Sequence, residues 1–327
     1  MPNTFRAVFP ALLLSLTLPC AMPLLAADPA PAEPASAEGA PAAPVERAPL
    51  LTRSQEDAIA LERQLPKQDL QQLQAGDESF LALWKPANSD DPQGAVIFVP
   101  GAGESADWPD TIGPLRRKFP NVGWSTLSLS LPDVQDEALM PREADTPAAA
   151  DAKAEASKDA PADAATTEAA SAEAQAAADT AKAAADAERA KAQAERMFAR
   201  IDSAISFAQQ NKARSIVLLG HSSGAYWAAR YLSERQPASV QKFVMIAARE
   251  PVNAEPLLLD MVPTLKMKTA DFIYKNQAQR AANDRLQASK RTKGPGFSQI
   301  GLIDIAGNNE AEQDQLFRRV RGWVEAK

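Results

Sequence analysis

The sequence predicts an α/β fold in which helices cover both faces of a mostly parallel sheet. Two observations lead to this fold class. Apolar runs of the kind found in strands buried on both faces alternate with helix-type segments along most of the 327-residue chain. One run, residues 215–219, continues through Gly-His-Ser-Ser-Gly into an alanine- and aromatic-rich segment of helical character. A strand, a sharp turn and a helix therefore follow one another at this point.

The sharp turn places Ser222 at its tip, between Gly220 and Gly224. A G-x-S-x-G turn needs its glycines because the serine backbone is strained and flanking side chains would collide with the neighbouring chain. The buried-type strand before the motif and the helix after it supply the context that the motif requires. We interpret it as the nucleophile elbow of an α/β-hydrolase fold, with Ser222 as the candidate nucleophile.

A second glycine-rich turn, Pro-Gly-Ala-Gly at residues 100–103, follows the buried strand expected over residues 95–99. In an α/β-hydrolase the loop after this strand donates one backbone N–H to the oxyanion hole, and the residue after the nucleophile donates the other. Ala102 and Ser223 are the candidate donors. The alternative is that these glycines serve only the geometry of a strand-to-helix turn.

The remaining elements are expected at intervals that fit the same fold. Arg116, Arg117 and Lys118 are interpreted as the solvated end of a helix, where cations complement the helix dipole. Further strands are expected over residues 78–84, 123–131, 242–248, 263–271 and 297–305, and helices over residues 54–65, 108–118, 197–208, 225–234 and 315–324.

The chain before the domain is typical of an exported protein. Residues 1–27 read as a cleaved signal peptide, with Arg6, an apolar stretch and a small-residue cleavage site. A Pro/Ala-rich linker follows over residues 28–51, and the domain is expected over residues 52–327. A lipoprotein with its lipid on Cys20 is disfavoured by Pro19 at the cleavage position. We expect periplasmic or secreted protein with no stable membrane span once the signal is removed.

Residues 141–195 form an Ala/Glu/Lys-rich, low-complexity insertion within the domain. It contains no leucine, isoleucine, valine or aromatic residue that could anchor it to a core. Its second half favours helix by intrinsic propensity, so we expect a solvent-exposed, partly helical arm. A tolerated insertion at a surface loop is favoured over a partner-binding arm or a spacer.

Composition narrows the function classes. A net charge of −7 argues against nucleic acid or an anionic membrane as partner. The chain has one cysteine and one histidine, so disulfides, zinc and haem are not expected, and no other metal or cofactor is indicated. Only a carboxylate site for calcium or magnesium stays open, and the D-x-D-x-D-G loop typical of one calcium site is absent.

From about residue 52 to its end, the chain resembles an uncharacterised family of secreted bacterial α/β-hydrolase-like proteins, a domain of unknown function. The resemblance implies the fold more than an activity. It is carried by residues 78–83, 99–104, 107–109, 220–227 and 318–323.

The chain departs from the α/β-hydrolase superfamily in its proton relay. A serine nucleophile needs a base, and the superfamily places a histidine after the last strand. That loop, residues 306–310, holds Asn308 and Asn309 instead. His221 is the only histidine, and its place before Ser222 should turn its side chain away from the hydroxyl. Asp271 is the candidate acid, although it would have no histidine to orient.

Two functions remain open from the sequence. The first is a degenerate hydrolase that binds a small molecule or a partner in the cell envelope. The second is an active serine esterase-like hydrolase that uses Ser222 with an unusual carboxylate base, such as Asp271 or Glu310. The missing histidine favours the first, and the preserved elbow favours the second. The sequence indicates no oligomeric state.

Overall fold

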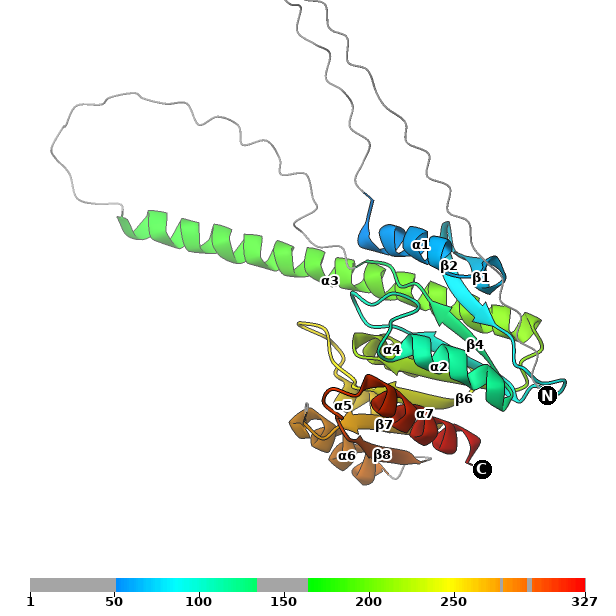
Figure 1. The fold of residues 1–327 in the computed structure, drawn as a ribbon. Coiled ribbons are helices and arrows are strands. Elements are labelled where there is room, and N and C mark those ends of the chain that lie inside the picture. Colours follow the sequence, from blue (N-terminus) through cyan, green and yellow to red (C-terminus); the bar gives the residue numbers. More distant parts are fainter. Residues whose placement is uncertain (1–50, 134–163, 277–278, 293–295, 327) are drawn as a thin grey trace, which may run out of the picture. The chain divides into compact units, whose positions relative to one another are not determined.

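The central element is an eight-stranded sheet in the order β1-β2-β4-β3-β5-β6-β7-β8. The computed structural model describes residues 51–133, 164–276, 279–292 and 296–326 (Figure 1). β2 runs antiparallel to both of its neighbours, β1 and β4. All the other neighbouring strands in this order, from β4 across β3 to β8, are parallel to each other. The strands are β1 Leu70–Ala75, β2 Glu78–Lys85, β3 Gly94–Val99, β4 Trp124–Leu129, β5 Ile216–His221, β6 Val240–Ile246, β7 Lys268–Tyr274 and β8 Phe297–Leu302.

Helices cover both faces of this sheet. α3 (Ala164–Gln210), α4 (Ser223–Arg235), α5 (Leu258–Met261) and α6 (Gln279–Thr292) cover one face. On the other face, α2 (Ile112–Lys118) and α7 (Asn309–Glu325) pack on the central and C-terminal strands, and α1 (Arg53–Gln64) packs against β2. Buried apolar side chains fill the space between the sheet and the helices on each face. This gives the three-layer α/β fold that the sequence predicts.

The expected elements are present, with differences at their ends. β5 lies between β3 and β6, so the strand that leads to Ser222 is central, as predicted. β1, the short helix α5 and α6 were not foreseen. β1 reads Leu-Gln-Gln-Leu-Gln-Ala, and its high glutamine content gives a weak strand signal. It forms a hairpin with β2 across Gly76, whose φ of 59° suits glycine.

Arg116 is not part of a solvated helix end. Only 1% of it is exposed, and its guanidinium lies between Asp69 and Asp107 at 3.0 Å from each carboxylate. Arg117, which also bonds Asp107, is half exposed and fits the expectation. The sequence pattern could not separate the two because the acidic partners of Arg116 come from distant segments of the chain.

The low-complexity insertion enters the structure through α3. Residues 175–177 and 179–192 of this helix are exposed, and Figure 1 shows that part of α3 extending beyond the sheet. Packing begins at Gln193 and Ala194, which are 8% and 2% exposed, so the docked part of the helix starts just inside the expected insertion. The first half of the insertion lies largely outside the described residues, as do the signal peptide and nearly all of the linker.

None of the helices in the described part of the chain is long and apolar enough to cross a membrane. No group of three or more histidine, cysteine, aspartate or glutamate side chains in this part of the chain is arranged to hold a metal ion.

Candidate active site

Ser222 lies in a strained turn between β5 and α4. Its φ of 53° and ψ of −125° fall in a region that side-chain-bearing residues rarely adopt. The turn is held from both sides: the Ser222 N–H donates to the Ile246 carbonyl at 3.0 Å, and the Arg249 N–H donates to the Ser222 carbonyl at 3.1 Å. The end of β6 and the loop after it therefore fix the backbone of the elbow.

The two glycines of the elbow are required by close backbone approaches. A Cβ atom on Gly220 would lie 2.4 Å from the Cα atom of Ala225. A Cβ atom on Gly224 would lie 2.2 Å from the carbonyl oxygens of both Val99 and Pro100. The Gly220–Gly224 pattern thus brings α4 directly against the end of β3, which sets the elbow beside the loop at residues 100–104.

Ala102 and Ser223, the candidate oxyanion donors, are in direct contact. The Ala102 N–H donates to the Ser223 hydroxyl at 2.7 Å, so this donor points at the serine side chain. A hydroxyl that accepts a hydrogen bond still has its own proton to donate. The site can therefore present the Ser223 O–H and N–H to a ligand oxygen, while the Ala102 N–H positions the hydroxyl.

Glu104 connects the loop to the histidine. Its Oε2 atom accepts hydrogen bonds from the Gly101 N–H at 2.7 Å and from His221 Nδ1 at 2.8 Å. His221 Nε2 lies 3.4 Å from the Thr111 hydroxyl. The side chains of Glu104 and His221 are 11% and 13% exposed. Both ring nitrogens of His221 are thus engaged away from Ser222, and the histidine holds the loop at residues 100–104 rather than the Ser222 side chain.

Asp271 lies within β7, not after it. The strand was expected to end at Asp271, but Phe272, Ile273 and Tyr274 continue it. Asp271 is 0% exposed and bonds Arg285 of α6 at 2.8 and 3.0 Å. Burial raises the pKa of its carboxyl, although Arg285 acts to lower it.

The register of the sheet separates Asp271 from the elbow. Gly220 pairs with Met245, and Met245 pairs with Asp271, so two strand spacings, about 10 Å, lie between β5 and this carboxylate. The carboxylate is committed to Arg285 and does not reach the Ser222 hydroxyl.

The loops that follow β7 and β8 carry a different pair. Asn276 donates its side-chain amide to the Asp304 carboxylate. Asn308 accepts the Ala311 N–H at 3.0 Å and caps the start of α7, and Glu310 is exposed. Among the described residues the Ser222 hydroxyl has no hydrogen-bond partner.

A cleft opens beside the elbow, with a volume of about 410 Å³. We call it the elbow cleft. Ala102 and Gly103 form its wall next to Ser223, while Met197 of α3 and Trp227 of α4 provide apolar walls. Leu51, at the start of the described chain, also lines this cleft and is 52% exposed.

Glu104 and Arg200 are the polar residues that sequence reasoning did not single out. Glu104 is part of the motif over residues 99–104, but its partner His221 is 117 positions away. Arg200 follows Met197 in an amphipathic helix and is only 6% exposed. A cation on the apolar side of a helix is the one signal that could have identified it.

Comparison with known proteins identifies the family and the fold. The chain matches the family described as "Protein of unknown function (DUF3530)" over residues 9–326. No curated protein matches it.

Solved structures share the fold at low sequence identity. An esterase from Pyrococcus furiosus has 10% identity and a TM-score of 0.50, covering 78% of this chain and 89% of its own. Est1E from Butyrivibrio proteoclasticus has 7% identity and a TM-score of 0.50, covering 79% and 100%. An α/β serine hydrolase homologue from Coxiella burnetii has 10% identity and a TM-score of 0.49, covering 78% and 99%. The chain belongs to the DUF3530 family of unknown function, and its fold is that of the α/β-hydrolases.

Proposed function

We propose that this protein binds a small, largely apolar ligand at the elbow and turns it over slowly or not at all. The observation that carries the proposal is that no side chain among the described residues is hydrogen-bonded to the Ser222 hydroxyl as a base would be. An unassisted serine hydroxyl is a weak nucleophile at neutral pH. The superfamily positions for acid and base are occupied instead by groups with structural roles, namely Asn276, Asp304 and Asn308.

The elbow cleft supports ligand binding. Its volume of about 410 Å³ is within the range of small-molecule sites, and its walls are mostly apolar. Ala102, in its wall, donates its N–H to the Ser223 hydroxyl, and that hydroxyl keeps a proton to donate to one ligand oxygen. This combination favours a ligand with an apolar body and a carbonyl-type oxygen, bound by the groups that would otherwise stabilise an oxyanion.

The test of this proposal is binding of the neutral fluorescent probe N-phenyl-1-naphthylamine. We expect saturable binding that Leu51→Asp weakens about tenfold, because a charge at the rim disfavours an apolar ligand. Ile303→Asp is the matched control, since both side chains are 52% exposed and Ile303 lies outside the cleft. Equal affinity in both variants, or no saturation by the wild type, would contradict the proposal.

A second candidate function is carboxylate-assisted hydrolysis, with Glu104 in place of the superfamily histidine. A Cβ atom on Gly101 would lie 3.0 Å from both Glu104 Oε1 and the Cβ atom of Ser222. The two residues therefore approach the same point, and Oε1 is the oxygen that Gly101 and His221 leave open. This alternative requires that Glu104→Gln and Ser222→Ala abolish ester hydrolysis to the same extent.

We also propose that the protein is exported and acts in the periplasm or outside the cell. The support is the positively charged start, the apolar stretch and the small-residue cleavage site within residues 1–27. Intact-mass analysis of protein from a periplasmic fraction should give a chain that begins at Asp28. A chain that retains residues 1–27, or one lipidated at Cys20, would contradict cleavage at this site.

A further inference from the structure

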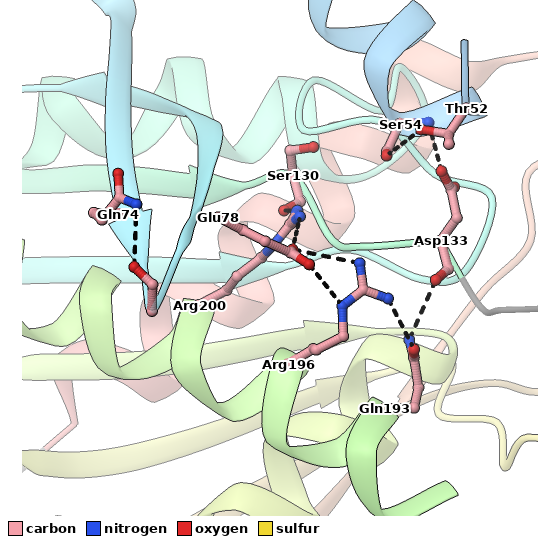
Figure 2. A network of polar contacts seen from close by, with 10 residues as sticks. Thr52, Ser54, Gln74, Glu78, Ser130, Asp133, Gln193, Arg196 and Arg200 are labelled. Atoms are coloured by element: carbon pink, nitrogen blue, oxygen red, sulfur yellow. Dashed lines mark hydrogen bonds and ion pairs between the residues drawn. The ribbon is translucent and has the colours of Figure 1, made fainter. Parts of the chain in front are cut away.

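A second cleft, more polar than the elbow cleft, adjoins it. Its volume is about 480 Å³, and α1, the β1–β2 hairpin and α3 surround it. Thr52 and Asp133 line both clefts, so the two adjoin. We call this second one the arginine cleft because Arg196 and Arg200 of α3 line it (Figure 2).

Arg200 is the unusual residue of the arginine cleft. Its side chain is only 7% exposed, and the guanidinium lies over the ring of Phe80, 4.9 Å from the centroid. One Nη donates to the Ser130 carbonyl, the other reaches Glu78 at 3.4 Å, and Nε has no hydrogen-bond partner among the described residues. A buried guanidinium with an N–H that lacks a hydrogen-bond partner lowers the stability of the fold unless another group pairs with its charge.

Both arginines of the arginine cleft contact the same acid, Glu78. Arg196 donates hydrogen bonds to both Glu78 oxygens, at 3.0 and 3.3 Å, and Arg200 donates a longer one to one of these oxygens (Figure 2). Asp133 accepts the Ser54 N–H and pairs with Arg53. Two guanidinium groups therefore face the cleft with one half-exposed carboxylate between them.

We propose that the arginine cleft binds a small hydroxylated acid, with its carboxylate or phosphate on Arg200 and Arg196. An oxyanion matches the forked N–H groups of arginine, and its charge would offset the desolvation of the buried Arg200 guanidinium. Side chains of Ser54, Ser79, Gln55 and Gln72 supply hydroxyl and amide groups around the rest of the cleft, which suits a ligand with several hydroxyl groups.

The test measures binding of glucose 6-phosphate and glucuronate to the full-length protein by titration calorimetry. Glucose serves as the neutral control. We expect at least one acid to bind with a Kd below about 10 mM, and glucose to bind at least about tenfold more weakly. The two acids together separate phosphate from carboxylate as the preferred group.

Variants assign the binding to the cleft. Arg200→Lys keeps the charge but loses the fork, so the affinity should fall about tenfold or more. Arg196→Gln, at a residue whose side chain is 31% exposed, should also weaken binding and serves as the decisive variant if Arg200→Lys fails to fold. Arg214→Gln, which removes an exposed arginine paired with Asp91, should leave binding unchanged. The absence of saturable binding, or equal binding by all three variants, would overturn the proposal.

Discussion

Gly224→Ala should destabilise the domain by about 3 kcal/mol or more, near the upper end of the range for overpacked sites. The new Cβ atom would lie 2.2 Å from two carbonyl oxygens, those of Val99 and Pro100. Val99 ends β3 and Pro100 follows it; both residues are buried, and the contacted atoms are backbone, so no flexible side chain can move aside. The backbone must shift, which separates α4 from the loop at residues 100–104.

Thermal unfolding of purified variants measures this effect. For a domain of this size the melting temperature should fall by roughly 10 °C, and failure to fold is the extreme of the same result. The matched control is Gly322→Ala in α7, where no atom lies within 4 Å of the new Cβ. That change should stabilise the helix by about 0.5–1 kcal/mol, because alanine is the better helix former. A melting temperature for Gly224→Ala within about 2 °C of the wild type would contradict the close approach.

Arg285→Met should cost about 3–5 kcal/mol at neutral pH, because it leaves the fully buried Asp271 carboxylate without its cation. Gln299, at 3.3 Å, would be the only hydrogen-bond donor left to it among the described residues. Arg321→Met is the control: it breaks an exposed pair with Glu325 on α7 and should cost no more than about 0.5 kcal/mol.

The effect of Arg285→Met should depend on pH, with a sign that follows from burial. Burial raises the pKa of the Asp271 carboxyl, and Arg285 is the main group that opposes this rise. Without Arg285 the folded-state pKa lies above the unfolded-state value, so the folded state holds a proton that the unfolded state releases. The variant therefore loses stability as the pH rises from the unfolded-state pKa of Asp271 through its folded-state pKa. Its free energy of unfolding should be closer to that of the wild type near pH 4 than near pH 7.

Chemical denaturation at both pH values checks this prediction. Adding Asp271→Asn to Arg285→Met removes the buried charge and should recover part of the loss at neutral pH. A penalty no larger than that of Arg321→Met, or one that does not change with pH, would show that Asp271 is not held as a buried ion pair.

The sequence predicted the parts of the site that depend on local backbone geometry. Gly220 and Gly224 flank Ser222 because the turn between β5 and α4 admits no side chain there. The apolar run of β5 fixed its central position in the sheet in the same way. Such features depend on residues that are adjacent in the sequence, so a single sequence is enough to predict them.

The parts that the sequence did not predict depend on contacts between distant segments. Asp271 was assigned to a strand end, but it lies in the middle of β7, where Arg285 pairs with it. Arg116 was interpreted as part of a charged helix end, yet Asp69 and Asp107 enclose it. The role of Glu104 follows from its hydrogen bond with His221, which lies 117 positions away in the sequence. In each case the partner of a charged group decides its role, and tertiary structure decides the partner.

Steady-state hydrolysis of p-nitrophenyl butyrate tests the central claim most directly. We expect the wild-type protein to show a rate close to the uncatalysed reaction, and Ser222→Ala to leave that rate nearly unchanged, because no base activates the serine. Glu104→Gln, measured beside them, reports on the Glu104 carboxylate, which approaches Ser222. Turnover at ordinary esterase rates that Ser222→Ala abolishes would contradict a binding function, and an equal loss in Glu104→Gln would identify the base.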